Sequence, residues 1–280
     1  MTLEGIIKEL DFDKDIEAVI LNTLNDEGEK IKRIAETAYE KDGRFYRLCS
    51  EDPLTRLVVI TYLAKQAYDI YDSYHIDHEI IIDTLKDISL RANMNYQRTG
   101  NIGLSKMEVD WLSRFLEGKI FKLGVMQFEI TKMYYIETIG REKVKMEYPE
   151  EIRSILTEDT YVINCHLQDG VKPDPDAVGE AKARAVSFFK KYFPEIEFKA
   201  FLGYTWFFYP KMVEHLPATS RIRQLAERYE VISSCPWNTL AMERLFPYGQ
   251  ENNGKPLTSL QKMAVEHPDW FGFSCGVIWL

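Results

Sequence analysis

Three polar residues alternate along one short hydrophobic run, and their types are those that acid–base chemistry uses. Asn164, His166 and Gln168 occupy every second position of the run 161–168. Side chains alternate between the two faces of a β-strand, so these three share one face. An unpaired buried polar group costs about 1–3 kcal/mol, and the face therefore needs partners, water or a ligand. Imidazole can accept a proton from an ammonium group; the other interpretation is a core histidine that bonds to the backbone.

A second run, 125–131, has the same alternation. Gln127, Glu129 and Thr131 point one way, and the residues between them are apolar. If both runs belong to one sheet, their polar faces line one cleft, where Glu129 orients His166 or acts as the base itself. The other interpretation is the solvent-facing side of a half-exposed strand.

The turn after the first run can approach a phosphate. It contains Gln168, Asp169, Gly170, Val171 and Lys172, and ends at Pro173 before a predicted helix. A helix N-terminus offers free N–H donors and a partial positive charge. Many turns of this kind bind no phosphate, and this one lacks a glycine-rich run.

Other candidate residues give weaker evidence for a functional site. His75 and His78 lack a further ligand motif, which favours a helix start over a metal site, so we expect no metal. Cys235 has no identified base partner, and the four cysteines form no CxxC pair, as is typical of reduced thiols in a cytoplasmic protein. The chain also has no GxSxG, P-loop or dinucleotide motif.

The elements that position these residues change in type along the chain. Helical stripes recur up to Gly118, and a capping box formed by Ser105 and Glu108 opens one of the helices. From Val125 on, period two and strand–helix alternation predominate. We therefore predict an α+β fold. Its mostly helical N-terminal domain, 1–141, ends in a strand, and a mixed α/β domain, 142–280, follows.

Composition excludes several classes. The formal net charge of the 280 residues is −9, which argues against a general nucleic-acid binder. The first residues are acidic and lack the apolar core of a signal peptide, and no run of 18 uncharged apolar residues occurs. We expect a cytoplasmic protein with a small-molecule substrate and no membrane or nucleic-acid partner. The sequence does not reveal its oligomeric state.

Several stretches resemble a known family. VINCHLQDG, SFFKKYFPE, GYTWFFYP and HLPATSRIRQLAERY resemble the GNAT-like C-terminal domain of bacterial two-domain acyltransferase domain-containing proteins. The part before them, including KLGVMQFE, resembles the helical domain that precedes it in this family. His166, Gln127 and Trp206 fall on recurring motif positions of the family; their chemical roles are inferred here.

The resemblance implies a sheet with two splayed strands, 161–168 and 198–208, that admit acetyl-CoA or another acyl-CoA, with its pyrophosphate at the turn 168–173. Tyr204 and Trp206 would then line the substrate cleft with Gln127 and Asn164. The superfamily's Q/R-x-x-G-x-G/A motif is missing from this turn. Two hypotheses follow: an N-acyltransferase, such as an N-acetyltransferase, acting on a small amine, or a non-catalytic GNAT-like binding module.

Overall fold

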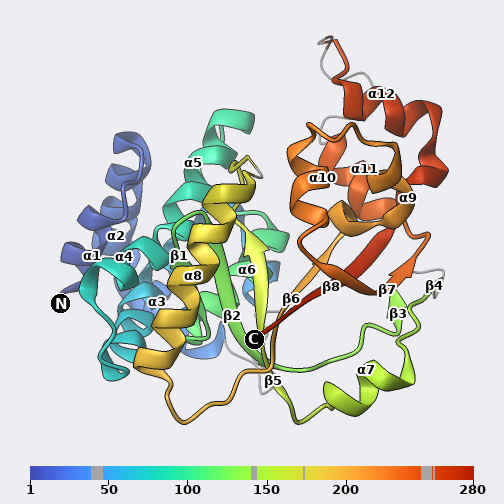
Figure 1. The fold of residues 1–280 in the computed structure, drawn as a ribbon. Coiled ribbons are helices and arrows are strands. Elements are labelled where there is room, and N and C mark those ends of the chain that lie inside the picture. Colours follow the sequence, from blue (N-terminus) through green and yellow to red (C-terminus); the bar gives the residue numbers. More distant parts are fainter. Residues whose placement is uncertain (39–46, 140–143, 173, 247–253, 255) are drawn as a thin grey trace. The chain divides into compact units, whose positions relative to one another are not determined.

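The computed structural model describes residues 1–38, 47–139, 144–172, 174–246, 254 and 256–280. The chain divides into two compact units, Met1–Leu123 and Gly124–Leu280. The domain boundary expected between residues 141 and 142 lies outside the described residues. Figure 1 follows the chain through both units.

Helices dominate the first unit, as the sequence periodicity predicts. Its elements are α1 (Leu3–Glu9), α2 (Lys14–Ala38), the 3-10 helix η1 (Leu48–Ser50), α3 (Pro53–Ser73), α4 (His78–Leu85), α5 (Asp87–Thr99), α6 (Lys106–Leu116) and strand β1 (Ile120–Leu123). Two of these helices begin at side-chain caps, one of which is the predicted capping box. The Asp52 carboxylate accepts hydrogen bonds from the first backbone N–H groups of α3, and Ser105 with Glu108 forms the capping box of α6.

The second unit combines strands and helices. Its elements are β2 (Met126–Lys132), β3 (Thr138–Ile139), β4 (Val144–Lys145), α7 (Glu150–Ile155), β5 (Tyr161–Leu167), α8 (Pro175–Tyr192), β6 (Ala200–Thr205), η2 (Trp206–Phe208), α9 (Pro210–His215), α10 (Arg221–Ala226), β7 (Glu230–Cys235), α11 (Thr239–Leu245), α12 (Ser259–Glu266), η4 (Pro268–Trp270) and β8 (Phe273–Trp279). The predicted α+β class is confirmed.

The strands of the second unit follow the order β2-β5-β6-β8-β7 across their sheet. β5 pairs antiparallel with β2 and parallel with β6, and β8 pairs antiparallel with both β6 and β7. One sheet face packs against α7 and the segment around β3 and β4, which contribute Met146, Tyr148 and Ile152 to an apolar cluster with Leu202 and Val277. The other face carries Cys165, which lies near α8 residue Lys182.

The apolar run 198–208 is not one continuous strand. β6 ends at Thr205, whose hydroxyl accepts a hydrogen bond from the Phe207 backbone N–H and so caps η2. The Phe208 ring then folds back over two glycines. A Cβ atom at Gly203 or Gly276 would lie 2.8 or 2.7 Å from this ring, which is closer than carbon atoms approach one another. This tertiary contact explains why the strand is shorter than predicted.

Candidate functional site

Pairing of β2 with β5 brings the two predicted polar faces together. Gln127 lies opposite His166 in the register, and Glu129 lies opposite Asn164. Side chains of directly opposed residues project to the same side of the sheet. All four therefore share one face of the sheet.

A carboxylate–imidazole pair stands on this face. His166 Nε2 lies 2.9 Å from Glu129 Oε2, and the two side chains are 20% and 15% exposed. The proximity of Glu129 and His166 expected from the sequence is confirmed. A carboxylate at one ring nitrogen fixes the imidazole orientation and stabilises the imidazolium that forms when the ring accepts a proton. This pair is able to act as a general base.

Asn164 adds a buried amide beside the pair. Its Nδ2 lies 3.4 Å from Glu129 Oε2 and donates to the Tyr134 hydroxyl at 3.2 Å. The residue is 2% exposed, and its Oδ1 has no hydrogen-bond partner in the part of the chain that the structure describes. Buried carbonyl oxygens normally accept a hydrogen bond. Asn164 Oδ1 is thus suited to a donor such as a water molecule or an amine.

Two stacked tyrosines lie next to Asn164. The rings of Tyr134 and Tyr204 are 5.2 Å apart with an interplanar angle of 22°, and the Tyr204 hydroxyl donates to the Tyr134 carbonyl at 2.9 Å. Burial raises the pKa of Tyr204 well above its usual range. Tyr134 is 40% exposed and follows β2 in a loop, where no periodic pattern marks it. The structure therefore brings Tyr204 to the site and adds Tyr134.

Trp206, the other predicted cleft residue, belongs to a different cluster. It is buried in η2 and packs with Met212, Ala241 and Phe271. Its ring centroid is 6.2 Å from that of Phe271. This environment gives Trp206 a packing role in the second unit.

The strands β5 and β6 part close to the site. Over the described residues, their ladder consists of Ile163 opposite Phe201 and Asn164 opposite Leu202. β5 continues to Leu167 and β6 to Thr205 beyond this ladder. Figure 1 shows the two strands together at their first residues and diverging toward their carboxyl ends. His166 therefore lies on the part of β5 that has left β6.

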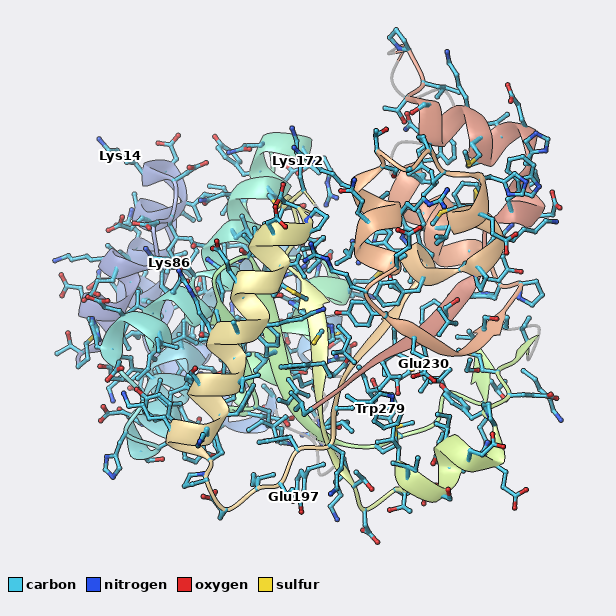
Figure 2. All side chains as sticks on the ribbon, in the orientation of Figure 1. Lys14, Lys86, Lys172, Glu197, Glu230 and Trp279 are labelled. Carbon is cyan, nitrogen blue, oxygen red and sulfur yellow. The ribbon has the colours of Figure 1, made fainter. Side chains whose placement is uncertain are left out.

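Acidic side chains in and just after the turn that follows β5 pair with arginines from other elements. Asp169 lies 3.4 Å from Arg244, and Asp176 lies 3.1 Å from Arg228. Lys172 is exposed and lies just before α8, as Figure 2 shows. Gly170 has a φ of 79°, a left-handed conformation that suits glycine. Arginine side chains from outside the turn thus offset its carboxylates.

The start of α8 is already capped. Asp174 accepts hydrogen bonds from the N–H groups of Asp176 and Ala177, each at 3.2 Å, and Pro175 has no N–H. Val171 is half-buried and Gln168 is buried, so the exposed part of the predicted phosphate turn is short. Pro173 lies outside the described residues. A phosphate at this turn would depend on Lys172 and the neighbouring arginines more than on the helix N-terminus.

The weaker candidates have structural roles. His78 contacts Glu9 and Tyr68, at 2.9 and 3.0 Å. Burial raises the pKa of Cys235, so this thiol stays protonated near neutral pH. All four cysteines are free. Across the described ranges, no group of three or more His, Cys, Asp or Glu residues could hold a metal ion, and no helix is long and apolar enough to cross a membrane.

Solved structures resemble the chain along its whole length. An acyltransferase in complex with CoA and 10C-teicoplanin aligns with a TM-score of 0.73 and 19% identity, covering 99% of this chain and 87% of that chain. One in complex with decanoyl-CoA and teicoplanin aligns at 0.72 with the same identity and coverage, as does a mutant in complex with octanoyl-CoA. At this identity the likeness establishes that the chain shares the fold of these proteins.

Family comparisons agree with the structural ones. The N-acyltransferase N-terminal domain matches residues 1–118, and the GNAT-like C-terminal domain matches residues 120–269, which is more than half of the chain. No curated protein matches the chain. The resemblance inferred from the sequence is confirmed: the chain belongs to the acyltransferase family that joins an N-acyltransferase N-terminal domain to a GNAT-like C-terminal domain.

Proposed function

We propose that this protein is an acyl-CoA-dependent N-acyltransferase whose acceptor is the amine of a small molecule. The observation that carries the proposal is the Glu129–His166 pair, with 2.9 Å between Oε2 and Nε2, on the stretch of β5 that has parted from β6. An amine acceptor is protonated at neutral pH and needs a base before it can attack a thioester. The pair supplies that base.

The side chains of the site divide the work. The imidazole of His166 takes a proton from the acceptor ammonium, and the Glu129 carboxylate stabilises the imidazolium. Asn164 Oδ1 accepts a hydrogen bond from a second N–H of the acceptor and so holds the nitrogen in position. Gln127, buried on the same face, and Tyr204 complete the polar and aromatic lining.

The acyl donor is an acyl-CoA, in line with the acyl-CoA complexes of the structurally similar acyltransferases. Those complexes contain decanoyl and octanoyl chains, so medium-chain donors are tested beside acetyl-CoA. The donor's phosphates would meet Gly170, Val171 and Lys172, with Gln168 and Asp169 at the base of the turn. Because the first N–H groups of α8 are capped by Asp174, the side-chain cations carry most of this binding.

A transfer assay tests the proposal. The protein is incubated with acetyl-, octanoyl- or decanoyl-CoA and a panel of primary amines, teicoplanin among them, and products are identified by mass spectrometry. We expect an acylated amine, and we expect His166→Asn to reduce kcat/KM by about 10²–10⁴-fold. His215→Asn is the matched control, because His215 is an exposed histidine at the end of α9. Equal rates for the two variants would refute the role of His166.

One observation favours the binding-module hypothesis. Asp169, Asp174 and Asp176 bring three carboxylates to the turn where phosphates would bind, and Asp174 occupies two helix N–H donors. Isothermal titration with each acyl-CoA separates the two functions. Binding with amine acylation supports the enzyme. No heat at millimolar concentration, together with no acylated product, supports the module.

A further inference from the structure

A buried lysine lies on the face of β5 opposite His166. Lys182, on α8, is 9% exposed, and its ammonium is 3.9 Å from the centroid of the Tyr229 ring. In the described part of the chain, no carboxylate forms a hydrogen bond or an ion pair with it. A buried charge is costly unless it is paired. A lysine in this environment is suited to an anion that a ligand brings.

Tyr229 places this lysine where the strands part. Its hydroxyl lies close to the Cys165 thiol on β5, and its ring lies beside Gly203 of β6. Cys165 is the first residue of β5 beyond the ladder with β6. Tyr229 thus reaches from one parted strand to the other, and Lys182 lies on its ring.

The alternation of side chains along β5 places one proton-transferring group on each face of the strand at the same point: the Glu129–His166 pair on one face and Lys182 on the other. Cys165 and His166 are consecutive strand residues, so their side chains point to opposite faces. A thioester held between the parted strands would meet the Glu129–His166 pair on one face and Lys182 on the other. We propose that the Lys182 ammonium donates the proton to the sulfur that leaves when the thioester is cleaved. This inference rests on the proposed acyl-CoA-dependent function.

The step balances with the residues described. The acceptor ammonium gives one proton to His166, and the free amine then forms a bond to the thioester carbonyl carbon while the π electron pair of the carbonyl moves to its oxygen. When the tetrahedral intermediate collapses, the carbon–sulfur bond breaks and its electron pair goes to sulfur. Lys182 transfers a proton to that sulfur, which leaves as the CoA thiol as the carbonyl reforms. The nitrogen loses its remaining surplus proton to water, and Lys182 regains a proton from water after release.

The surroundings of Lys182 support proton donation. The pKa of Lys182 is lowered to about 8, chiefly by burial; Cys165 opposes this effect, and the neighbouring Arg228 adds to it. An alkyl thiol has a pKa of about 8.5, so the pKa values of the Lys182 ammonium and the leaving thiol are matched. The groups facing the ammonium are Cys165 on β5 and Arg228 and Tyr229 before β7. Burial raises the pKa of Cys165 to about 12, so this thiol is not the acyl-accepting nucleophile.

Two measurements on the full chain test the proposal. The first is release of CoA from decanoyl-CoA, with hydroxylamine as a small amine acceptor. The second is an ultraviolet titration of the thiolate of bound CoA, with the desulfo-CoA complex as the blank. Lys182→Met removes the ammonium, and Lys182→Arg keeps the charge but cannot give up its proton. Lys190→Met is the control, because Lys190 is an exposed lysine of the same helix.

We expect Lys182→Met to lower kcat by at least about 100-fold, with KM and the affinity for desulfo-CoA within about twofold of the wild type. The thiol of bound CoA should titrate about one pH unit lower or more in the wild type than in Lys182→Met. Lys182→Arg should keep the lowered thiol pKa and lose turnover.

Three outcomes of these measurements would overturn the proposal. Wild-type turnover in either Lys182 variant overturns the proton-donor role. A loss of desulfo-CoA affinity as large as the loss of kcat also overturns it, because Lys182 would then only hold the fold or the cofactor. If the wild type itself releases no CoA while Lys190→Met and the wild type are both folded, the proposed function fails and the inference fails with it.

Discussion

Replacing Lys182 by methionine should stabilise the second unit at neutral pH. The pKa of this lysine falls from 10.5 to about 8 in the folded protein, chiefly because burial disfavours the ammonium. At about 1.36 kcal/mol per pH unit, the difference corresponds to about 3 kcal/mol. Loss of the contact with the Tyr229 ring offsets about 0.5–2 kcal/mol. We therefore expect a net gain of about 1–3 kcal/mol in the free energy of unfolding at pH 7.

The stability that Lys182→Met gains over the wild type should decrease as the pH rises above 8. Between pH 8 and 10.5 the unfolded chain holds the proton of Lys182 and the folded protein does not. Stability rises with pH wherever the unfolded state binds more protons, so the wild type becomes more stable across this window. Lys182→Met has no proton to lose. Its advantage is full below pH 8 and disappears as the pH approaches 10.5.

Urea unfolding followed by tryptophan fluorescence measures this effect. Four of the five tryptophans, all except Trp111, lie in the second unit, so the signal reports mainly on that unit. The exposed Lys190→Met control should stay within about 0.5 kcal/mol of the wild type. If Lys182→Met is less stable than the wild type at pH 7, or if its advantage is unchanged at pH 10, the buried ammonium is not a destabilising group and the reasoning fails.

Four further predictions address the site and the fold. Glu129→Gln should lower kcat about 10²-fold or more without changing the unfolding midpoint of the protein by much, measured by the transfer assay and thermal melting. Asp174→Ala removes the cap of α8 and should cost about 0.5–2 kcal/mol in urea unfolding. Gly276→Ala places a Cβ 2.7 Å from the Phe208 ring and should cost about 1–3 kcal/mol. Lys172→Glu should weaken decanoyl-CoA binding in calorimetry while the circular dichroism spectrum stays unchanged; unchanged affinity would exclude this turn as the phosphate site.

Periodicity predicted the part of the site that regular strands build. Alternation in two runs was sufficient to put Gln127 and Glu129 on one face and Asn164 and His166 on another, and antiparallel pairing of these runs joins the faces. The sequence could not show which strands are neighbours, because pairing between distant runs depends on the tertiary fold.

Two residues of the site were not identified from the sequence, for different reasons. Tyr134 lies in a loop, where no periodic signal exists, and only its contacts with Asn164 and Tyr204 identify it. Lys182 did leave a signal: it falls four residues after Val178 and three before Ala185, on the buried stripe of α8. A charged residue on an apolar helical stripe is rare enough to mark a functional candidate.

Because β5 separates from β6, a ligand between the two strands can contact side chains from both faces of β5 at the same point. In a continuous parallel sheet the backbone of β5 would be occupied on both edges, and residues on its two faces would be separated by the sheet itself. Beyond Asn164 the edge toward β6 is released, while pairing with β2 still holds His166 and Glu129 in register. A ligand at that edge can therefore be approached from above and below, by a base on one side and by an ammonium on the other. The same dipeptide, Cys165–His166, fixes both approaches, so a change in β5 register by one residue would exchange the two faces and remove acid and base together.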